Sequence, residues 1–183
     1  MPSLRCIRIV SFSGDALDDA GMSNLVPLDP IFVYVNRSLL TGTGVARFGE
    51  MKSLTGLATL HIVKPTQEAK EALSNHPALE TLRLWPKGVA WLTDASVKHF
   101  STIPKLKKLT VDLFVLSYDR GLNLLNELPN LSTLEFHEAA IFEADLAKLK
   151  ADLPRVQITF SPMPPEYRAQ WEAWAARLSG AKK

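Results

Sequence analysis

The stretch Leu79–Leu84, LETLRL, and the stretch Leu131–Phe136, LSTLEF, carry nearly the same pattern at two places in the chain. Each begins with Leu, has a second Leu three residues later, and has a third large apolar residue two residues after that. In both cases a proline, Pro77 or Pro129, stands two residues upstream. An echo of this kind predicts a repeated structural unit, and its period predicts the fold.

Seven windows of the chain place an aliphatic or aromatic residue at positions 1, 4 and 6. They are Leu4-Ile7-Ile9, Leu28-Ile31-Val33, Leu57-Leu60-Ile62, Leu79-Leu82-Leu84, Leu106-Leu109-Val111, Leu131-Leu134-Phe136 and Leu153-Val156-Ile158. Neighbouring windows begin 22 to 29 residues apart and together cover the chain from residue 4 to about residue 160. One such window arises easily by chance, whereas seven in succession at one period indicate a repeat array.

The segments between the windows have the periodicity of short helices. Val97, Phe100, Ile103 and Leu106 are spaced three residues apart, as one buried helix face requires. The windows themselves alternate apolar and polar residues, as half-buried strands do. Each unit is therefore expected to run strand, turn, helix, loop. No unit can bury its apolar side alone, so stacked units are expected to share one core.

Two stretches resemble a known family. DDAGMSNL at residues 18–25 and LTDASVKHFSTIPKLKKLTV at residues 92–111 resemble the TDAGL-type units of ribonuclease-inhibitor-like and bacterial leucine-rich repeat proteins. The resemblance covers about residues 4–160. It implies an α/β solenoid of about seven strand–helix repeats with a parallel concave sheet, in a single domain over residues 1–183. The chain departs from the family because most units lack the asparagine after the strand. In addition, the helical segment of the second unit is expected to be about three residues shorter than in the family's pattern, and that of the third unit about three residues longer.

The two ends of the expected array differ. SPMPPEYRAQWEAWAARLSGAKK at residues 161–183 places Tyr167, Trp171, Trp174 and Leu178 on one stripe, which predicts a helix over about residues 164–179. That helix is expected to cap the last unit, and the alternative is a helix that binds a partner. The first window starts at residue 4 without a cap. Either the natural chain is longer, or the free strand edge pairs with a second copy to form a homodimer.

Positions 3, 5 and 7 of each window are expected on the open, concave face of the sheet. The resulting set of candidate binding residues is Phe32, Tyr34, His61, Arg83, Trp85, Asp112, Glu135 and His137. Its first half is rich in aromatic residues and arginine, the types enriched at binding hot spots. The alternative is that the loops after Trp85 (PKGVAWLT) or after Asp112 (LFVLSYD) fold back over this face.

Catalysis finds little support in the sequence. Asp112, Glu135 and His137 fall on neighbouring strands and could hold a metal or move protons, but such residues on a polar sheet face more often form a solvated charge cluster. Cys6 lies two units from His61, too far for an activated nucleophile. The Gly-rich GTGVARFG at residues 42–49 lacks the spacing of a phosphate-binding loop. We therefore expect no catalytic residues, no metal and no cofactor.

Composition sets the remaining expectations. The chain has 183 residues, 46% of them hydrophobic, and a formal net charge of +2, which is too small to predict a nucleic-acid partner. No apolar run is long enough to span a membrane. The opening residues are interrupted by Arg5 and Arg8 and do not read as a signal peptide. A cytoplasmic location is the default expectation, and a removed N-terminal segment stays open as the alternative.

The function that the resemblance implies is a non-enzymatic module that binds another protein on its concave face. The alternative function is a structural unit that self-associates through its N-terminal edge. The sequence identifies neither the partner nor the pathway.

Overall fold

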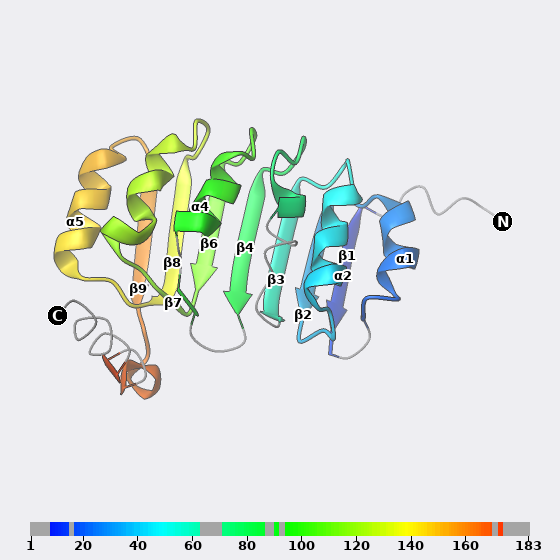
Figure 1. Cartoon of the computed structure of the whole chain (residues 1–183), viewed down its shortest axis with the longest axis horizontal. Coiled ribbons are helices and arrows are strands. Elements are labelled where there is room, and N and C mark those ends of the chain that lie inside the picture. The colour runs from blue at the N-terminus through cyan, green and yellow to red at the C-terminus, as the bar shows by residue number, and fades with distance from the viewer. Residues whose placement is uncertain are drawn as a thin grey trace.

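Seven parallel strands form one sheet whose order in space is their order in the sequence (Figure 1). The computed structural model describes residues 8–14, 17–62, 71–86, 90–91, 94–169 and 172–173, with the backbone only for residues 60–62, 90–91 and 96. The strands are β1 Ile9–Ser13, β2 Phe32–Asn36, β3 Gly56–Ile62, β4 Thr81–Pro86, β6 Lys108–Asp112, β8 Thr133–Ala139 and β9 Gln157–Pro162. The short strands β5 Ala90–Trp91 and β7 Phe114–Val115 form a second, two-stranded ladder.

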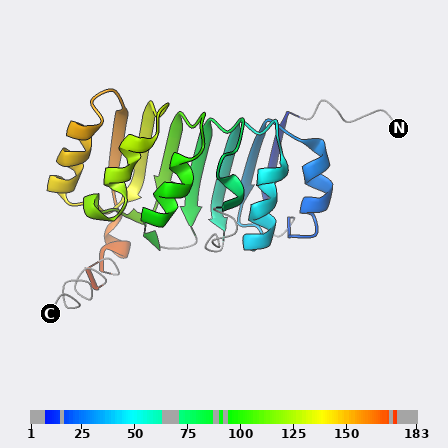
Figure 2. The same cartoon turned by 45° about the horizontal axis from the view of Figure 1, so that its top comes forward.

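Helices and 3-10 turns connect the strands and lie on one face of the sheet (Figures 1 and 2). The α-helices are α1 Met22–Leu25, α2 Gly42–Ala46, α4 Asp94–Ser101 and α5 Glu143–Asp152. The 3-10 turns are η1 Val26–Leu28, η2 Arg47–Glu50, η3 Tyr118–Arg120 and η4 Leu122–Glu127. No described helix covers the other face of the sheet, which is called the open face below.

The strands bury alternate side chains under the helices. Val33, Leu57, Leu82, Leu109 and Leu134 stand side by side on five neighbouring strands, and each is at most 1% exposed. They join apolar residues of the helices and turns in one continuous hydrophobic core. Replacing one such leucine by alanine costs about 2–5 kcal/mol of folding free energy. This core holds the open face in place, because every strand contributes to both.

Successive units dock on one another through the same backbone contacts. The carbonyl of Thr55 accepts hydrogen bonds from the N–H groups of Glu80 and Thr81, at 2.8 and 3.0 Å. The carbonyl of Glu80 accepts from Lys107 and Lys108 at the same two distances, and the pattern recurs at the next strand. The recurring contact fixes the register of each strand against its neighbour.

The predicted strands exist, but the predicted register is correct only for the windows that begin at Leu79, Leu106 and Leu131. In the first window Ile9 was expected in the core, yet it pairs with Phe32 and is 69% exposed, while Val10 faces inward beside Val33. In the third window Thr59 was expected on the open face, yet it is 2% exposed and faces inward like Leu57, while the side chains of Leu60 and Ile62 lie outside the described residues. The second and seventh windows are displaced by two residues, which preserves the face of each side chain.

The register errors have a physical cause. The third unit has Thr59 at a core position where the pattern asks for an aliphatic residue, and the side chain is accommodated because its hydroxyl lies 3.4 Å from the carbonyl oxygen of Arg83. A search for aliphatic residues therefore passes over Thr59 and assigns the core positions of this unit to Leu60 and Ile62 instead. With the observed register, the paired positions Ile9, Phe32, Gly56, Thr81, Lys108, Thr133 and Gln157 lie 23 to 27 residues apart. The expected short second unit and long third unit are thus wrong.

The segment after Asp112 packs inward. Residues 113–116 are buried, and Phe114 and Leu116 belong to the hydrophobic core. Val115 also pairs with Ala140 as an isolated bridge. The apolar side chains of this segment are therefore in the core instead of spread over the open face. In the loop after Trp85, residues 87–89 and 92–93 lie outside the described residues.

The two ends of the sheet are edges within the described residues, because β1 pairs only with β2 and β9 only with β8. Residues 165–169 and 172–173 are helical, and Met163 before them is 7% exposed. The remainder of the expected capping helix, including Trp171, Trp174 and Leu178, lies outside the described residues, as do residues 1–7. No helix among the described residues is long and apolar enough to cross a bilayer.

Candidate functional site

The strand register arranges the open face in rows that run across the sheet. The row nearest the start of the strands is Ile9, Phe32, Gly56, Thr81, Lys108, Thr133 and Gln157, and the next is Ser11, Tyr34, Ala58, Arg83, Thr110, Glu135 and Thr159. Apolar and aromatic side chains occupy the N-terminal half and charged side chains occupy the middle. The open face therefore has two halves of different chemistry, separated at β3.

The aromatic half is shaped by a glycine. A Cβ atom on Gly56 would lie 2.3 Å from Cδ2 of Phe32, so the ring of Phe32 rests directly over the backbone of β3. Phe32 and Tyr34 are both half-buried on β2. Their position on the open face agrees with the sequence prediction, and their role in binding stays a prediction.

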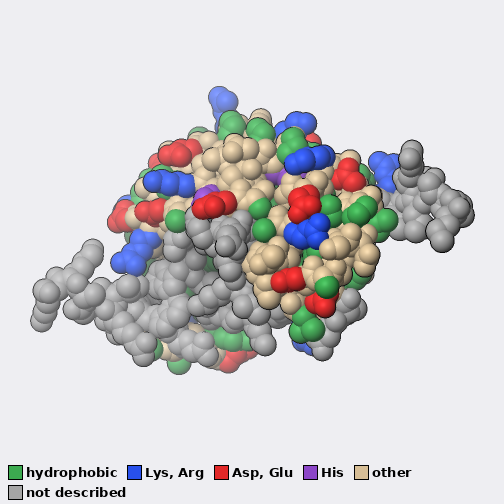
Figure 3. Space-filling model, turned by 45° about the vertical axis from the view of Figure 1, so that its right-hand side comes forward, with side chains coloured by type: hydrophobic (Ala, Val, Ile, Leu, Met, Phe, Trp, Pro, Cys, Tyr) green, Lys and Arg blue, Asp and Glu red, His purple; other side chains and the backbone are tan. Residues whose placement is uncertain are grey.

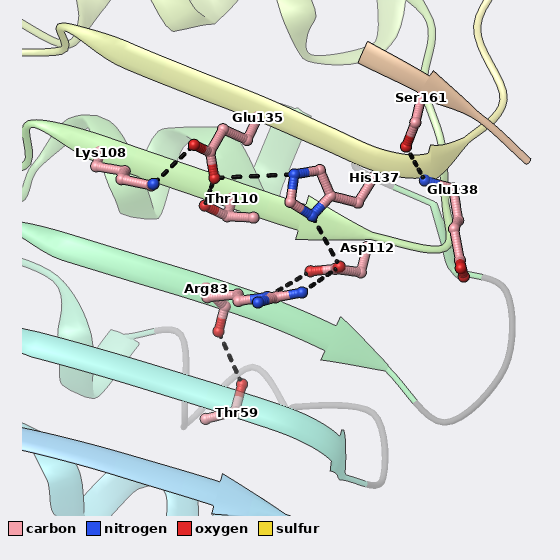
Figure 4. A network of polar contacts seen from close by, with 9 residues as sticks. All are labelled: Thr59, Arg83, Lys108, Thr110, Asp112, Glu135, His137, Glu138 and Ser161. Carbon is pink, nitrogen blue, oxygen red and sulfur yellow. Dashed lines mark hydrogen bonds and ion pairs between the residues drawn. The ribbon is translucent and has the colours of Figure 1, made fainter. Parts of the chain in front are cut away.

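The centre of the charged half is an ion pair between β4 and β6 (Figure 4). Nε and Nη2 of Arg83 donate to the two carboxylate oxygens of Asp112 at 2.9 and 2.7 Å. The Asp112 side chain is 3% exposed and that of Arg83 is 34% exposed. A paired guanidinium favours its charged form, so the hydrogen bond to Asp112, opposed in part by burial, raises the pKa of Arg83. The pair fixes both side chains in one geometry.

A second ion pair lies beside the first. Nζ of Lys108 donates to Oε1 of Glu135 at 2.7 Å, and the hydroxyl of Thr110 donates to Oε2 at 3.0 Å. Burial alone would raise the pKa of Glu135, but the hydrogen bonds from Lys108 and Thr110 outweigh burial and hold it below its usual value. Glu135 is therefore an ionised acceptor at neutral pH.

His137 links the two pairs. Its Nδ1 lies 3.3 Å from Oδ1 of Asp112, and its Nε2 lies 3.9 Å from Oε2 of Glu135. The imidazole points between the two carboxylates, as Figure 4 shows. Arg83, Lys108, Thr110, Asp112, Glu135 and His137 together form one connected group, which is called the charge network below. It contains two permanent cations and two carboxylates, so its members largely neutralise one another.

A hollow of about 460 Å³ opens beside the charge network. Its lining comes from Arg83 and Trp85 of β4, Asp112 of β6, His137 and Glu138 of β8, and residues 159–161 of β9. The Arg83 guanidinium carbon lies 5.6 Å from the centroid of the Trp85 ring, which is within the range of a cation–π contact. The hollow thus combines charged groups with the indole of Trp85.

Two of the strands that line the hollow, β6 and β8, carry a left-handed residue next to it. Leu113 and Glu138, which follow Asp112 and His137, have left-handed φ angles of 57° and 50°. Such conformations cost of order 1–3 kcal/mol for residues other than glycine. The N–H of Glu138 donates to Oγ of Ser161 at 3.0 Å and holds the turn. Leu113 directly follows the last residue of β6, and Glu138 lies at a register irregularity within β8, where pairing resumes at Ala139.

Most of the predicted site residues lie where the sequence placed them. Asp112, Glu135 and His137 come together on β6 and β8, and Arg83 and Trp85 lie on β4 next to them. The side chain of His61 lies outside the described residues. Its backbone falls at a shift of register between Leu60 and Ile62.

Sequence reasoning missed the residues of the hollow that come from the last two strands. Glu138, Phe160 and Ser161 were not singled out, because the last window was displaced by two residues and Glu138 follows the regular part of β8. The turn geometry at Glu138 has no clear signal in the sequence. Thr110 was assigned to the open face but not recognised as a partner of Glu135.

The donors of the charge network do not form a metal centre. No group of three His, Cys, Asp or Glu side chains among the described residues is arranged so that it could hold a metal ion. Both oxygens of Asp112 accept from Arg83, and both oxygens of Glu135 accept from Lys108 or Thr110. A metal at this place would have to displace two short ion pairs, so the arrangement favours a structural or recognition role for these carboxylates.

Positive and negative side chains are interspersed on the described part of the surface that faces the viewer in Figure 3. Together with the net charge of +2, this distribution gives no support to a nucleic-acid site on that part of the surface.

No protein-family model matches the chain, and no curated protein matches it in sequence. The function therefore has to be argued from the open face itself.

Proposed function

We propose that the chain is a leucine-rich repeat solenoid that binds another protein on the open face of its sheet and catalyses no reaction. The strand order and the strand spacing of 23 to 27 residues support the solenoid, because a period of roughly 20–29 residues with one strand per unit is typical of that fold. The binding role follows by analogy with the fold and from the chemistry of the face.

The observation that carries the proposal is a sheet face that no helix of the described residues covers and that presents aromatic side chains. Parallel sheets usually have both faces covered. Here Phe32, Tyr34 and Trp85 are only partly buried, and Ile9 is 69% exposed. Aromatic residues beside ion-paired residues are the composition expected of a protein interface. The charge network adds specificity, because its groups are held in fixed positions.

Affinity capture tests the proposal. Wild-type chain and a Tyr34→Ala/Trp85→Ala variant are used to capture proteins from native lysate, and the captured proteins are identified by mass spectrometry. The matched control is Leu39→Ala/Phe142→Ala, which removes two apolar side chains that are 56% and 58% exposed and do not belong to the open-face rows. A partner held by the wild type and the control but lost by the first variant supports the proposal. A partner that all three proteins hold equally contradicts it.

Self-association through β1 is the second candidate. The edge of β1 has no strand partner among the described residues, and the exposed Ile9 lies on it. This candidate predicts a dimer in sedimentation equilibrium that Ile9→Lys converts to a monomer. A wild-type chain that stays monomeric at high concentration excludes it.

A further inference from the structure

The hydrophobic core is least completely covered at the two ends of the sheet, β1 and β9 (Figure 1). In the inward row that runs from Val10 to Ile158, the five central members are at most 1% exposed, whereas Val10 and Ile158 are only partly buried. In the next inward row Val35 and Phe136 are 0% exposed, but Phe160 at the end of the row is 37% exposed. Among the described residues, apolar surface therefore stays open at both ends.

The backbone contact that docks one unit on the next is also incomplete at both ends. Between units, the carbonyl just before one strand accepts from the start of the next strand, as the Glu80 carbonyl accepts from Lys107 and Lys108. The carbonyl of Val156 has the corresponding place before β9, and no described N–H group donates to it. At the other end β1 pairs only with β2 among the described residues, so the N–H of Ile9 has no carbonyl of a preceding unit to reach. One end thus lacks donors and the other lacks an acceptor.

The two incomplete edges match each other. A parallel strand added beside β9 in the register of the sheet would place two inward side chains next to Ile158 and Phe160. The β1 strand of a second copy supplies Val10 and Phe12 at these positions, because they occupy the same two rows at the other end of the array. It also brings the missing N–H donor to the carbonyl before β9. The missing unit at one end is therefore equivalent to the first unit of another copy.

We propose that copies of this chain associate head to tail, with β1 of one copy pairing in parallel with β9 of the next. Unpaired strand edges are ready templates for such pairing. The sheet, the core and the open face then continue across the junction, and further copies can add because the contact does not close on itself. The proposal takes up the self-association candidate above and names the second surface that it uses. It does not depend on protein binding at the open face.

Two exposed residues report the pairing without disturbing the core. Ser11 and Thr159 stand at opposite ends of one outward row, so Thr159 of one copy would lie beside Ser11 of the next. Sedimentation equilibrium of the full chain compares Ser11→Glu/Thr159→Lys with Ser11→Lys/Thr159→Lys. Opposite charges side by side on two strands attract and like charges repel. We therefore expect the first variant to associate about two- to tenfold more tightly than the second.

The same comparison separates head-to-tail pairing from symmetric pairing. If β1 paired with β1 of another copy, or β9 with β9, both variants would bring like charges together, and the first would associate no more tightly than the second. That result overturns the proposal and leaves symmetric self-association standing. A wild-type chain that stays monomeric at the highest concentration it reaches overturns both forms of self-association and leaves protein binding at the open face unaffected.

A proline in β1 tests the backbone pairing. Successive N–H groups of a parallel strand point to opposite sides, and the Arg8 carbonyl faces β2, where it accepts from Phe32, so the N–H of Ser11 points to the free edge. Ser11→Pro removes that N–H at a place where an edge strand tolerates proline, and Ser11→Ala is the matched control that keeps it. We expect Ser11→Pro to weaken association at least about tenfold with an unchanged far-ultraviolet circular dichroism spectrum, and Ser11→Ala to associate like the wild type. Wild-type association of a folded Ser11→Pro variant overturns the proposal.

Discussion

The ion pair between Arg83 and Asp112 yields the most specific energetic prediction, because its two partners differ in exposure. Arg83→Met leaves the Asp112 carboxylate, whose side chain is 3% exposed, without its guanidinium. Breaking a buried pair from one side costs about 3–5 kcal/mol. Asp112→Asn leaves a guanidinium on a side chain that is 34% exposed and that water can reach. We therefore expect Asp112→Asn to cost less than Arg83→Met, at or below about 3 kcal/mol.

A double-mutant cycle measures the pair itself. The free energies of unfolding of wild type, Arg83→Met, Asp112→Asn and the double variant are obtained from urea unfolding followed by far-ultraviolet circular dichroism at pH 7. The expected coupling energy is about 2 kcal/mol, since charge-assisted bonds contribute about 1.5–3 kcal/mol. Arg47 and Glu50 provide the control cycle, because their salt bridge at 2.9 Å is solvent-exposed and should give a much smaller coupling.

The reasoning is refuted if the Arg83–Asp112 coupling is no larger than that of the control pair. It is also refuted if Asp112→Asn destabilises the fold more than Arg83→Met, because the exposure of the stranded group would then not determine the cost.

Two further predictions concern the packing between units. His76 is 2% exposed, and its ring lies between two backbone groups. Its Nε2 lies 2.9 Å from the Met51 carbonyl oxygen, and its Nδ1 accepts a hydrogen bond from the Leu79 N–H at 3.1 Å, so a neutral ring satisfies both contacts. Burial lowers the pKa of His76. The folded-state pKa lies below the unfolded value of about 6.5, so the contribution of the neutral His76 ring to the free energy of unfolding is fully present above about pH 6.5. That contribution is lost as the pH falls toward the folded-state pKa, by up to about 1.4 kcal/mol per pH unit. Urea unfolding at pH 7.5 and 5.5 should show this extra loss in wild type but not in His76→Leu, and identical pH dependence in the two proteins would contradict it. A Cβ atom on Gly49 would lie 2.2 Å from the Ala72 carbonyl oxygen, so Gly49→Ala should lower the free energy of unfolding by about 1–3 kcal/mol in the same assay. Gly21→Ala is the control and should cost less, because the nearest neighbour of its Cβ atom would be a Leu17 methyl group at 3.2 Å. Equal losses of stability in the two variants would show that the close approach at Gly49 is not rigid.

The sequence predicted the α/β class and the parallel strands because several units carry an aliphatic residue at every core position. The unit with Leu79, Leu82 and Leu84 fits the pattern in only one register, and the structure confirms that register. Where a core position holds Thr59, the pattern moved to the nearby Leu60 and Ile62. A buried threonine is stable there because of a hydrogen-bond partner on the next strand, and such a partner cannot be read from one strand alone.

The candidate site was predictable to the extent that it depends on which face a strand presents. Asp112, Glu135 and His137 were expected together and lie together. The ion pair of Arg83 with Asp112 runs diagonally between different rows, so it depends on side-chain conformation and not on alternation alone. Glu138 escaped prediction because it has a left-handed backbone at an irregularity of the β8 pairing, where simple alternation of faces does not hold.

Site-specific photo-crosslinking tests the central claim most directly. A photoreactive phenylalanine analogue is placed at Tyr34 on the open face or at Leu39, which is 56% exposed and follows the end of β2. The account predicts that a protein partner is crosslinked covalently from position 34 and not from position 39. Capture of the same protein from position 39 but not from position 34 would contradict the assignment of the open face as the binding surface.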